Sequence, residues 1–178
     1  MCSRQSDFGF RLMAAELWIR DLLRPRQAIL AEVGVQPGMC VLDFGCGPGS
    51  YVLPAAELVG DSGLVYALDT HPLAIAAVCK RSARKNLVNV RAIRSDCNTG
   101  LGDREVDVVL LYDVLHDLAN RREVLRELHR VLKPEGVLSV SDHHLSREQL
   151  VSRVTNVGGL FRLQQERRWT VAFARGQT

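Results

Sequence analysis

The sequence predicts an α/β fold in which helices cover both faces of a mostly parallel sheet. Between residues 40 and 142, short apolar runs of strand length alternate with longer segments whose apolar residues recur at helical spacing. Strands that are joined by helices pair in parallel through right-handed crossovers, so the helices come to lie on both faces. The last two apolar runs, 160–167 and 169–175, have no helix between them, and we therefore expect an antiparallel hairpin at the edge of the sheet.

The elements follow one another from the N-terminus as the apolar spacing predicts. A two-piece helical segment is expected over 8–33, because Pro25 opens its second piece and Gly34 ends it. The next two helices are predicted at 50–59 and 72–86. The seven strands are predicted at 40–44, 64–69, 90–96, 106–113, 136–142, 160–167 and 169–175.

Two later helices carry start signals. Asn120 and Glu123 have the spacing of a capping box, and Pro134 is expected to stop the helix that they open. Ser146 and Gln149 have the same spacing and predict the start of the last helix.

The composition is that of one globular domain. The chain has 178 residues, of which 47% are apolar and 24% charged, and a net charge of +3 that is too small for a dedicated nucleic-acid binder. No apolar run reaches the ~18 residues of a membrane span. The five cysteines include no C-x-x-C pair, and the N-terminus lacks the apolar core of a secretory signal. We therefore expect a reduced, cytoplasmic protein.

The strongest signal for chemistry is the run VLDFGCGPGS at 41–50. A strand that ends on Asp43 turns through Gly45, Gly47 and Gly49 into a helix. Glycines permit positive φ angles and close approach of a ligand to the backbone, and the N-terminus of the helix offers free N–H groups. The turn therefore predicts a site for a carboxylated or polar ligand, although glycines also occur in turns that bind nothing.

Two further acids stand at the ends of the next two strands. Asp69 follows the turn by about 20 residues, where an acid in doubly wound folds accepts hydrogen bonds from ribose hydroxyls. Asp96 ends the third strand, in position to meet an adenine edge. Either acid could instead cap the turn or helix that follows it. Together with the glycine turn they predict one nucleoside pocket at the carboxyl edge of the sheet.

A nicotinamide dinucleotide is the competing ligand. Its fingerprint is G-x-G-x-x-G, and here Ser50 stands at the third glycine position while Pro48 stiffens the turn. A dehydrogenase would usually also need a second half or a substrate domain, for which the chain is too short. The sequence therefore argues against dinucleotide binding.

The ordered set DFGCGPGSY, ALDTHPLAI, RSDC, DVVLLYDVLHDL and LHRVLKPEGVLSVSD resembles the motifs of class I S-adenosylmethionine-dependent methyltransferases, in particular their small-molecule, ubiquinone-biosynthesis-like branch. The resemblance covers roughly residues 35–175. It implies a Rossmann-like, doubly wound, three-layer αβα fold whose seven strands have the order 3-2-1-4-5-7-6, with the last strand antiparallel. It also implies a single methyltransferase domain over 1–178, with a helical preface or lid over 1–34 and an S-adenosylmethionine-binding core over 35–178.

The resemblance further implies which residues bind the methyl donor, S-adenosylmethionine, and its product, S-adenosylhomocysteine. The residues around the methionine moiety would be Asp43, Gly45, Cys46, Gly47 and Gly49. Those around the ribose would be Asp69 with Thr70 or His71, and those around the adenine Asp96 and the backbone of Cys97. Tyr112 and Asp113 would lie beside the methionine amino group and the methyl.

Methyl transfer from a sulfonium requires the acceptor to be aligned at ~3 Å, and it requires a base only when the acceptor is protonated. Candidate bases lie in the two loops that follow the fourth and fifth strands and converge over the methyl. The predicted catalytic residues are Asp113, His116 and His143, with Asp117, Asp142 and His144 as further candidates. A cation held by the aspartates and histidines of these loops is conceivable, but the spacing does not fix such a site, and we predict no metal.

The predicted function is methyl transfer to a small, apolar or aromatic acceptor in the cytoplasm. A non-catalytic regulatory protein that binds S-adenosylmethionine or S-adenosylhomocysteine is the alternative from another class. An RNA methyltransferase is a second alternative, because a basic run extends from Lys80 to Arg94, but aromatic residues that could stack bases are few. Thiols at Cys46 and Cys97 could bind arsenite, although small buried fillers are the simpler role. The helical preface at residues 1–34 would select the acceptor by acting as a lid. It could equally pack into the core or form the face of a homodimer.

Overall fold

The structure is a computed structural model of the chain, and it describes residues 26–176. Its helices are α2 (Arg26–Val33), α3 (Val52–Val59), α4 (Pro72–Arg84), α5 (Arg121–Val131) and α6 (Arg147–Thr155). Its strands are β1 (Cys40–Phe44), β2 (Leu64–Asp69), β3 (Val90–Arg94), β4 (Val106–Tyr112), β5 (Leu132–Ser141), β6 (Phe161–Glu166) and β7 (Val171–Arg175). Helix α2 is the second piece of the predicted N-terminal segment. The first piece, and with it most of the predicted lid, lies outside the described residues.

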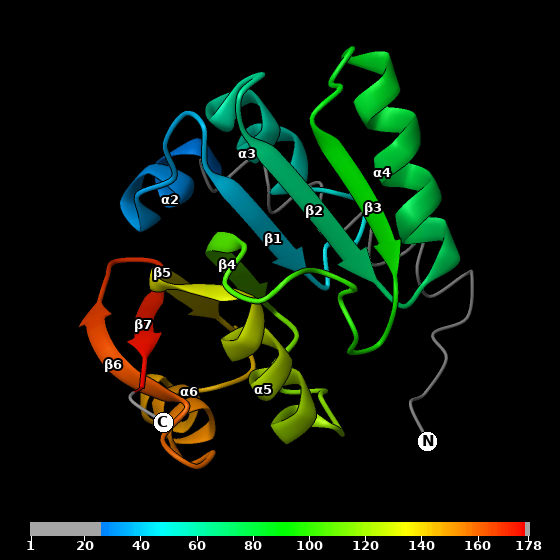
Figure 1. The fold of residues 1–178 in the computed structure, drawn as a ribbon. Coiled ribbons are helices and arrows are strands. Elements are labelled where there is room, and N and C mark those ends of the chain that lie inside the picture. Colours follow the sequence, from blue (N-terminus) through cyan, green and yellow to red (C-terminus); the bar gives the residue numbers. More distant parts are fainter. Residues whose placement is uncertain (1–25, 177–178) are drawn as a thin grey trace.

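The seven strands form one sheet in the order β3-β2-β1-β4-β5-β7-β6, which confirms the predicted order (Figure 1). Strand β1 pairs in parallel with β2 and β4, and parallel pairing continues to β3 on one side and to β5 on the other. Strand β7 is antiparallel to both β5 and β6, so the predicted hairpin closes one edge of the sheet. The strand order reverses between β1 and β4. In doubly wound folds, ligands bind outside the carboxyl ends of the strands at such a reversal.

Helices cover both faces of the sheet and complete three layers. Helices α2, α3 and α4 pack on one face around a core that includes Ile29, and α5 and α6 pack on the other around a core that includes Leu125. The neighbouring β1 residues Val41 and Leu42 belong to different cores, because successive strand residues point to opposite faces. No described helix combines the length and the apolar character needed to cross a membrane.

The structure corrects the predicted start of the fifth strand. Strand β5 begins at Leu132 rather than at residue 136, because α5 leads into it without a loop and Leu132 already has φ −73° and ψ 133°. Its pairing with β4 is irregular, with Leu132 opposite Val106 and Val137 opposite Val108. The extra residues of β5 therefore bulge out between Leu132 and Val137 and break the alternation from which a strand is recognised.

One of the two predicted capping boxes is wrong. The side chain of Asn120 makes no capping hydrogen bond within the described chain, because its backbone (φ −100°, ψ 35°) is not extended as a cap residue requires. Ser146 has the extended backbone (φ −66°, ψ 159°) and forms the predicted reciprocal box with Gln149. His71 caps α4, since its Nδ1 accepts the N–H of Leu73 at 3.2 Å.

Candidate functional site

Three glycines turn the chain from β1 toward α3 at the point where the strand order reverses. Gly45, Gly47 and Gly49 have φ angles of 80°, 51° and 85°, which other residues adopt only with strain. A Cβ atom on Gly45 would lie 2.3 Å from Cγ2 of Val114, in the loop after β4. The turn is therefore both left-handed and too closely packed for a larger residue, as expected of backbone built for close approach.

Asp69 ties this glycine turn to the start of α4. Its Oδ2 accepts the N–H of Gly47 at 2.9 Å, and its Oδ1 accepts the N–H of His71 at 2.8 Å. Asp69 thus hydrogen-bonds to the turn that leads into α4, whereas the cap of the helix itself is His71. Because each carboxylate oxygen can accept a second hydrogen bond, the same geometry leaves capacity for the hydroxyls of a ribose.

Asp43 lies buried beneath the glycine turn, with 3% of its surface exposed. Among the residues that the structure describes, none hydrogen-bonds to its Oδ2. Burial, with repulsion from Asp69, raises the pKa of Asp43 to about 7, and Arg26 opposes part of this rise. A buried carboxylate with unused acceptor capacity fits a cationic ligand group, such as the ammonium of the methionine moiety.

The other residues predicted to bind the nucleoside lie around the ends of β2 and β3. Thr70 is exposed, and the half-buried His71 follows it at the start of α4. Asp96 is exposed in the loop after β3, and Cys97 is half-buried beside it. The N–H of Cys97 donates to Oγ of Ser95 at 3.3 Å, so this backbone group is already used within the loop. The structure thus brings the predicted residues to one edge, next to Asp69.

Tyr112 and Cys46 are turned into the fold. The hydroxyl of Tyr112 lies 2.8 Å from Oγ of Ser139, and its ring meets the ring of Tyr51 edge-on at 4.7 Å between centroids. The thiol of Cys46 is buried and contacts its neighbour's carbonyl, and burial raises its pKa. The arginine at the start of α2, Arg26, stacks over Tyr51 at 4.3 Å and donates to its hydroxyl. Arg26 was not among the predicted residues, although an arginine on the apolar face of a predicted helix is an unusual feature of the sequence.

The loops after β4 and β5 exchange hydrogen bonds. Asp142, which follows β5, accepts the backbone N–H of His116 at Oδ2, and the same oxygen lies 2.9 Å from Nδ1 of the His116 ring. Asp113, which follows β4, accepts the backbone N–H of His143 at 3.1 Å and lies 2.7 Å from Nδ1 of that ring. Each acid therefore holds the histidine of the opposite loop. We call these two contacts the crossed pairs; they unite the three predicted catalytic residues with Asp142.

Two features fix the crossed pairs in place. Asp113 has a φ of 55°, which is uncommon for a residue other than glycine, and its N–H donates to the carbonyl of Ser141 at 2.7 Å. The ring of His144 lies between the two others, with centroids 4.2 Å from His116 and 3.8 Å from His143. The three imidazoles thus form one cluster at the carboxyl ends of β4 and β5, in which the ring of His144 is tilted by 50° to that of His116 and by 41° to that of His143.

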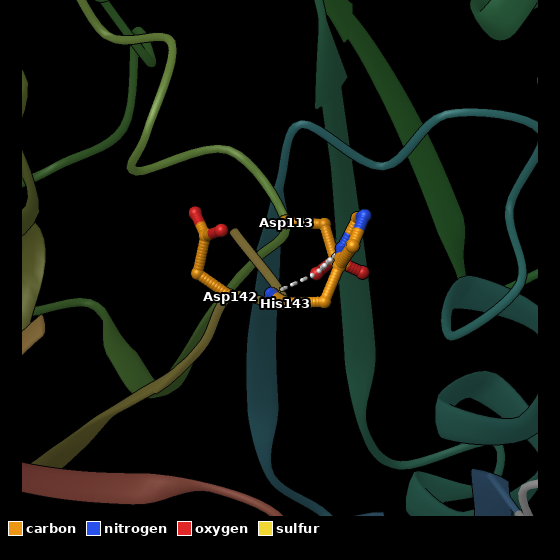
Figure 2. A group of neighbouring side chains, drawn as sticks. All are labelled: Asp113, Asp142 and His143. Carbon is orange, nitrogen blue, oxygen red and sulfur yellow. Dashed lines mark hydrogen bonds and ion pairs between the residues drawn. The ribbon is translucent and has the colours of Figure 1, made fainter. Parts of the chain in front are cut away.

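Asp113, Asp142 and His143 also form a group that could hold a cation (Figure 2). One possible ligand atom from each lies within 4.8 Å of the others. Figure 2 shows the ring of His143 paired with Asp113, whereas the carboxylate of Asp142 points away from that pair. Both Asp142 oxygens accept backbone hydrogen bonds, from His116 and from His144. In this structure the carboxylates are therefore engaged by the two loops.

Comparisons with known proteins cover most of the chain. A protein-family model described as "Methyltransferase domain" matches residues 36–175. The demethylmenaquinone methyltransferase of Geobacillus sp. (strain WCH70) is 30% identical over 125 residues, which are 70% of this chain and 53% of that protein. The ubiquinone/menaquinone biosynthesis C-methyltransferase UbiE of Marinomonas sp. (strain MWYL1) is 27% identical over 127 residues, which are 70% of this chain and 51% of that protein. The chain thus spans about half the length of the curated relatives it matches.

A solved structure shares the architecture. The crystal structure of a SAM-dependent methyltransferase from Aquifex aeolicus matches with a TM-score of 0.76 and 25% sequence identity. The match covers 84% of this chain and 89% of that chain. The likeness therefore extends over nearly the whole of both folds.

Proposed function

Because the chain belongs to the methyltransferase domain family, we propose that it is an enzyme that transfers a methyl group from S-adenosylmethionine to a small-molecule acceptor and releases S-adenosylhomocysteine. The family match runs from just before β1 to the end of β7. The solved structure with the same fold is described as SAM-dependent, which supports S-adenosylmethionine as the methyl donor.

The donor would lie across the carboxyl ends of β1, β2 and β3. We assign the methionine moiety to the glycine turn and Asp43, the ribose to Asp69 with Thr70 and His71, and the adenine to Asp96 and Cys97. Bound S-adenosylmethionine supplies an electrophilic methyl group on a sulfonium. The contribution of the chain is to hold the donor so that this methyl faces the loops after β4 and β5.

The acceptor would meet the methyl beside the crossed pairs. The side chains of His116 and His143 are 30% and 47% exposed, so an acceptor can reach their rings from solvent. Neutral imidazole is a suitable proton acceptor near pH 7. We therefore assign Asp113, His116 and His143 to the acceptor side. Curated relatives are named for methylation of demethylmenaquinone, which favours an apolar aromatic acceptor of this kind.

The observation that carries the proposal is the glycine turn, closed by Asp69 above the buried Asp43 at the reversal of strand order. A non-catalytic binding protein would need this turn but not solvent-reachable histidines beside it, so the crossed pairs favour an enzyme. An RNA substrate is less favoured, because part of the basic run is used within the fold: Arg81 donates to the carbonyl of Pro48 at 2.7 Å, and Lys85 pairs with Glu57.

A screen with labelled donor tests this function. The purified full chain is incubated with methyl-labelled S-adenosylmethionine and a small-molecule extract, and the label is followed by chromatography. We expect label in an apolar small molecule. The control variant Asp61→Asn, which changes an exposed acid at the turn before β2, should transfer as much label as the wild-type chain. Label in RNA would identify the second alternative. Binding of S-adenosylhomocysteine without any label transfer would favour the regulatory protein.

The proposal includes a cytoplasmic location. Self-association through residues 1–34 stays a prediction, and it concerns mainly residues outside the described range. Size-exclusion chromatography of the full chain and of a chain that begins at Arg26 would detect a dimer that depends on the preceding segment.

A further inference from the structure

We infer that Asp142 is a positioning residue that keeps the ring proton of His116 on Nδ1, so that Nε2 of this ring is the base for the methyl acceptor. This inference rests on the proposed function, because it assigns roles within the same site. It also implies an acceptor that loses a proton on methylation, and among these we propose a hydroxyl compound such as a phenol or a hydroquinone.

The carboxylate of Asp142 is fixed on both oxygens. Its side chain is 0% exposed. Oδ1 accepts the N–H of His144 at 3.0 Å and Oδ2 accepts the N–H of His116 at 2.9 Å. Two backbone donors therefore set the orientation of a carboxylate that solvent does not reach.

This carboxylate determines where the imidazole proton resides. An ionised carboxylate only accepts hydrogen bonds, so the 2.9 Å contact between its Oδ2 and Nδ1 of His116 requires the proton on Nδ1. The neutral ring then carries its lone pair on Nε2. No described residue hydrogen-bonds to Nε2, and the His116 side chain is 30% exposed. A basic nitrogen is thus available at the carboxyl ends of β4 and β5, beside the turn that would hold the donor.

The chemical step then balances without a further reactant. The acceptor hydroxyl gives its proton to Nε2 of His116, and the charge of the imidazolium is offset by Asp142. The electron pair of the acceptor forms the new bond to the methyl carbon as the methyl–sulfur bond breaks, and the sulfur keeps that pair as a neutral thioether. Proton transfer of this kind contributes about 10²- to 10⁴-fold to a rate.

The second crossed pair is placed differently. Asp113 and His143 have side chains that are 18% and 47% exposed, compared with 0% and 30% for Asp142 and His116. Water competes more strongly for a pair with such exposure, so its hydrogen bond fixes the ring less firmly. We propose that the Asp113–His143 pair holds the loop after β5 against the end of β4, since His143 directly follows Asp142 in the chain.

Imidazole ¹⁵N spectroscopy tests the tautomer directly. The full chain, labelled in its five histidines, is studied at pH 8 with and without S-adenosylhomocysteine, and the rings are assigned by single His→Gln variants. We expect the His116 proton on Nδ1 in the wild-type chain and in the control Asp61→Asn. A wild-type ring with its proton on Nε2 would overturn the inference. Equimolar Mn²⁺ that broadens both the His116 and the His143 ring signals would also overturn it, because the carboxylates would then be ion ligands.

Kinetics with matched acceptors test the consequence. The probes are 1,4-naphthalenediol, kept reduced, and 1,4-dimethoxynaphthalene, which has no hydroxyl proton to lose. We expect methylation of the diol alone, and a fall in kcat of about 10²-fold or more in Asp142→Asn, because an amide cannot offset the imidazolium charge. The fall in Asp113→Asn should be at least about tenfold smaller.

Measurements of S-adenosylhomocysteine binding separate the role of Asp142 from the proposed function. Calorimetry should give Asp142→Asn and wild-type chains the same affinity for S-adenosylhomocysteine within about twofold. Equal kcat values in the two chains, or methylation of the dimethoxy compound, would overturn the inference while leaving the proposed function intact. Failure of the folded wild-type chain to bind S-adenosylhomocysteine would instead contradict the proposed function itself.

Discussion

Asp43 shows how a residue that we assign to ligand binding can cost stability. It is buried beneath the glycine turn, and its pKa is raised to about 7, whereas an aspartate in an unfolded chain titrates near 3.9. Between these two values the folded chain holds a proton that the unfolded chain has lost. The free energy of unfolding therefore falls as pH rises through this window, because the group then has to ionise in a buried place.

Replacement of this carboxyl group by a neutral amide should remove the penalty. We expect the stability advantage of Asp43→Asn over the wild-type chain to grow by about 3 kcal/mol between pH 5 and pH 8, since about two pKa units of this window lie below the raised pKa and each corresponds to about 1.4 kcal/mol. Urea denaturation at the two pH values measures this gain. A stability difference between the two chains that does not change with pH would contradict the raised pKa.

The individual site residues were predictable from sequence to different degrees. Asp43 and Asp69 could be proposed as ligand-binding residues because each lies at or next to the end of an apolar strand that leads into a turn. The crossed pairs could not, because they depend on the register between β4 and β5 and on the left-handed backbone of Asp113. Neither feature leaves a pattern in the sequence.

The turn between β1 and α3 depends on glycine for two separable reasons, backbone angle and space. Gly100 has a similar φ of 70°, but no atom of residues 26–176 lies within 4 Å of the position of a Cβ atom there, whereas a Cβ on Gly45 would meet Val114. We expect Gly100→Ala to cost about 1 kcal/mol from the backbone alone, and Gly45→Ala about 2 kcal/mol more from the added contact. Chemical denaturation of both variants gives the comparison. Equal costs would mean that the contact with Val114 relaxes freely.

The two helix starts offer a second matched comparison. Ser146→Ala removes a cap that the structure shows, and it should lower the free energy of unfolding by about 1 kcal/mol. Asn120→Ala removes a side chain without a capping hydrogen bond in the described chain, and it should change stability by less than about 0.5 kcal/mol. Urea denaturation of the two variants is the measurement. A larger loss from Asn120→Ala would contradict the cap assignment.

Apolar patterning predicted the elements well where each strand is regular. The bounds of β1 and β2 agree with the predicted ranges, because both strands are short, buried and bounded by turn residues. The start of β5 was missed because its first residues bulge. The cap at Asn120 was predicted wrongly, because the spacing of Asn120 and Glu123 does not report the backbone angles of Asn120. Patterns of residue type thus specify elements, whereas local distortions within them arise from tertiary pairing.

At the scale of the whole molecule, the residues assigned to the donor and those assigned to the acceptor lie on different strands of the sheet. Strands β1 to β3 carry the glycine turn, Asp69 and Asp96 on one side of the strand-order reversal, and β4 and β5 carry the crossed pairs on the other. The alternation of strands and helices was enough to predict a parallel sheet. The order of its seven strands came from resemblance to a family, since periodicity alone does not say which strands are neighbours.

Calorimetric titration of the full chain with S-adenosylhomocysteine tests whether the glycine turn and Asp69 form the donor site. We expect one site in the wild-type chain and in Asp61→Asn, and an affinity at least about tenfold weaker in Asp69→Ala, which corresponds to about 1.4 kcal/mol. Thermal unfolding confirms that each chain is folded before it is titrated. Absence of binding to the folded wild-type chain, or equal affinity in Asp69→Ala, would contradict this assignment of the donor site.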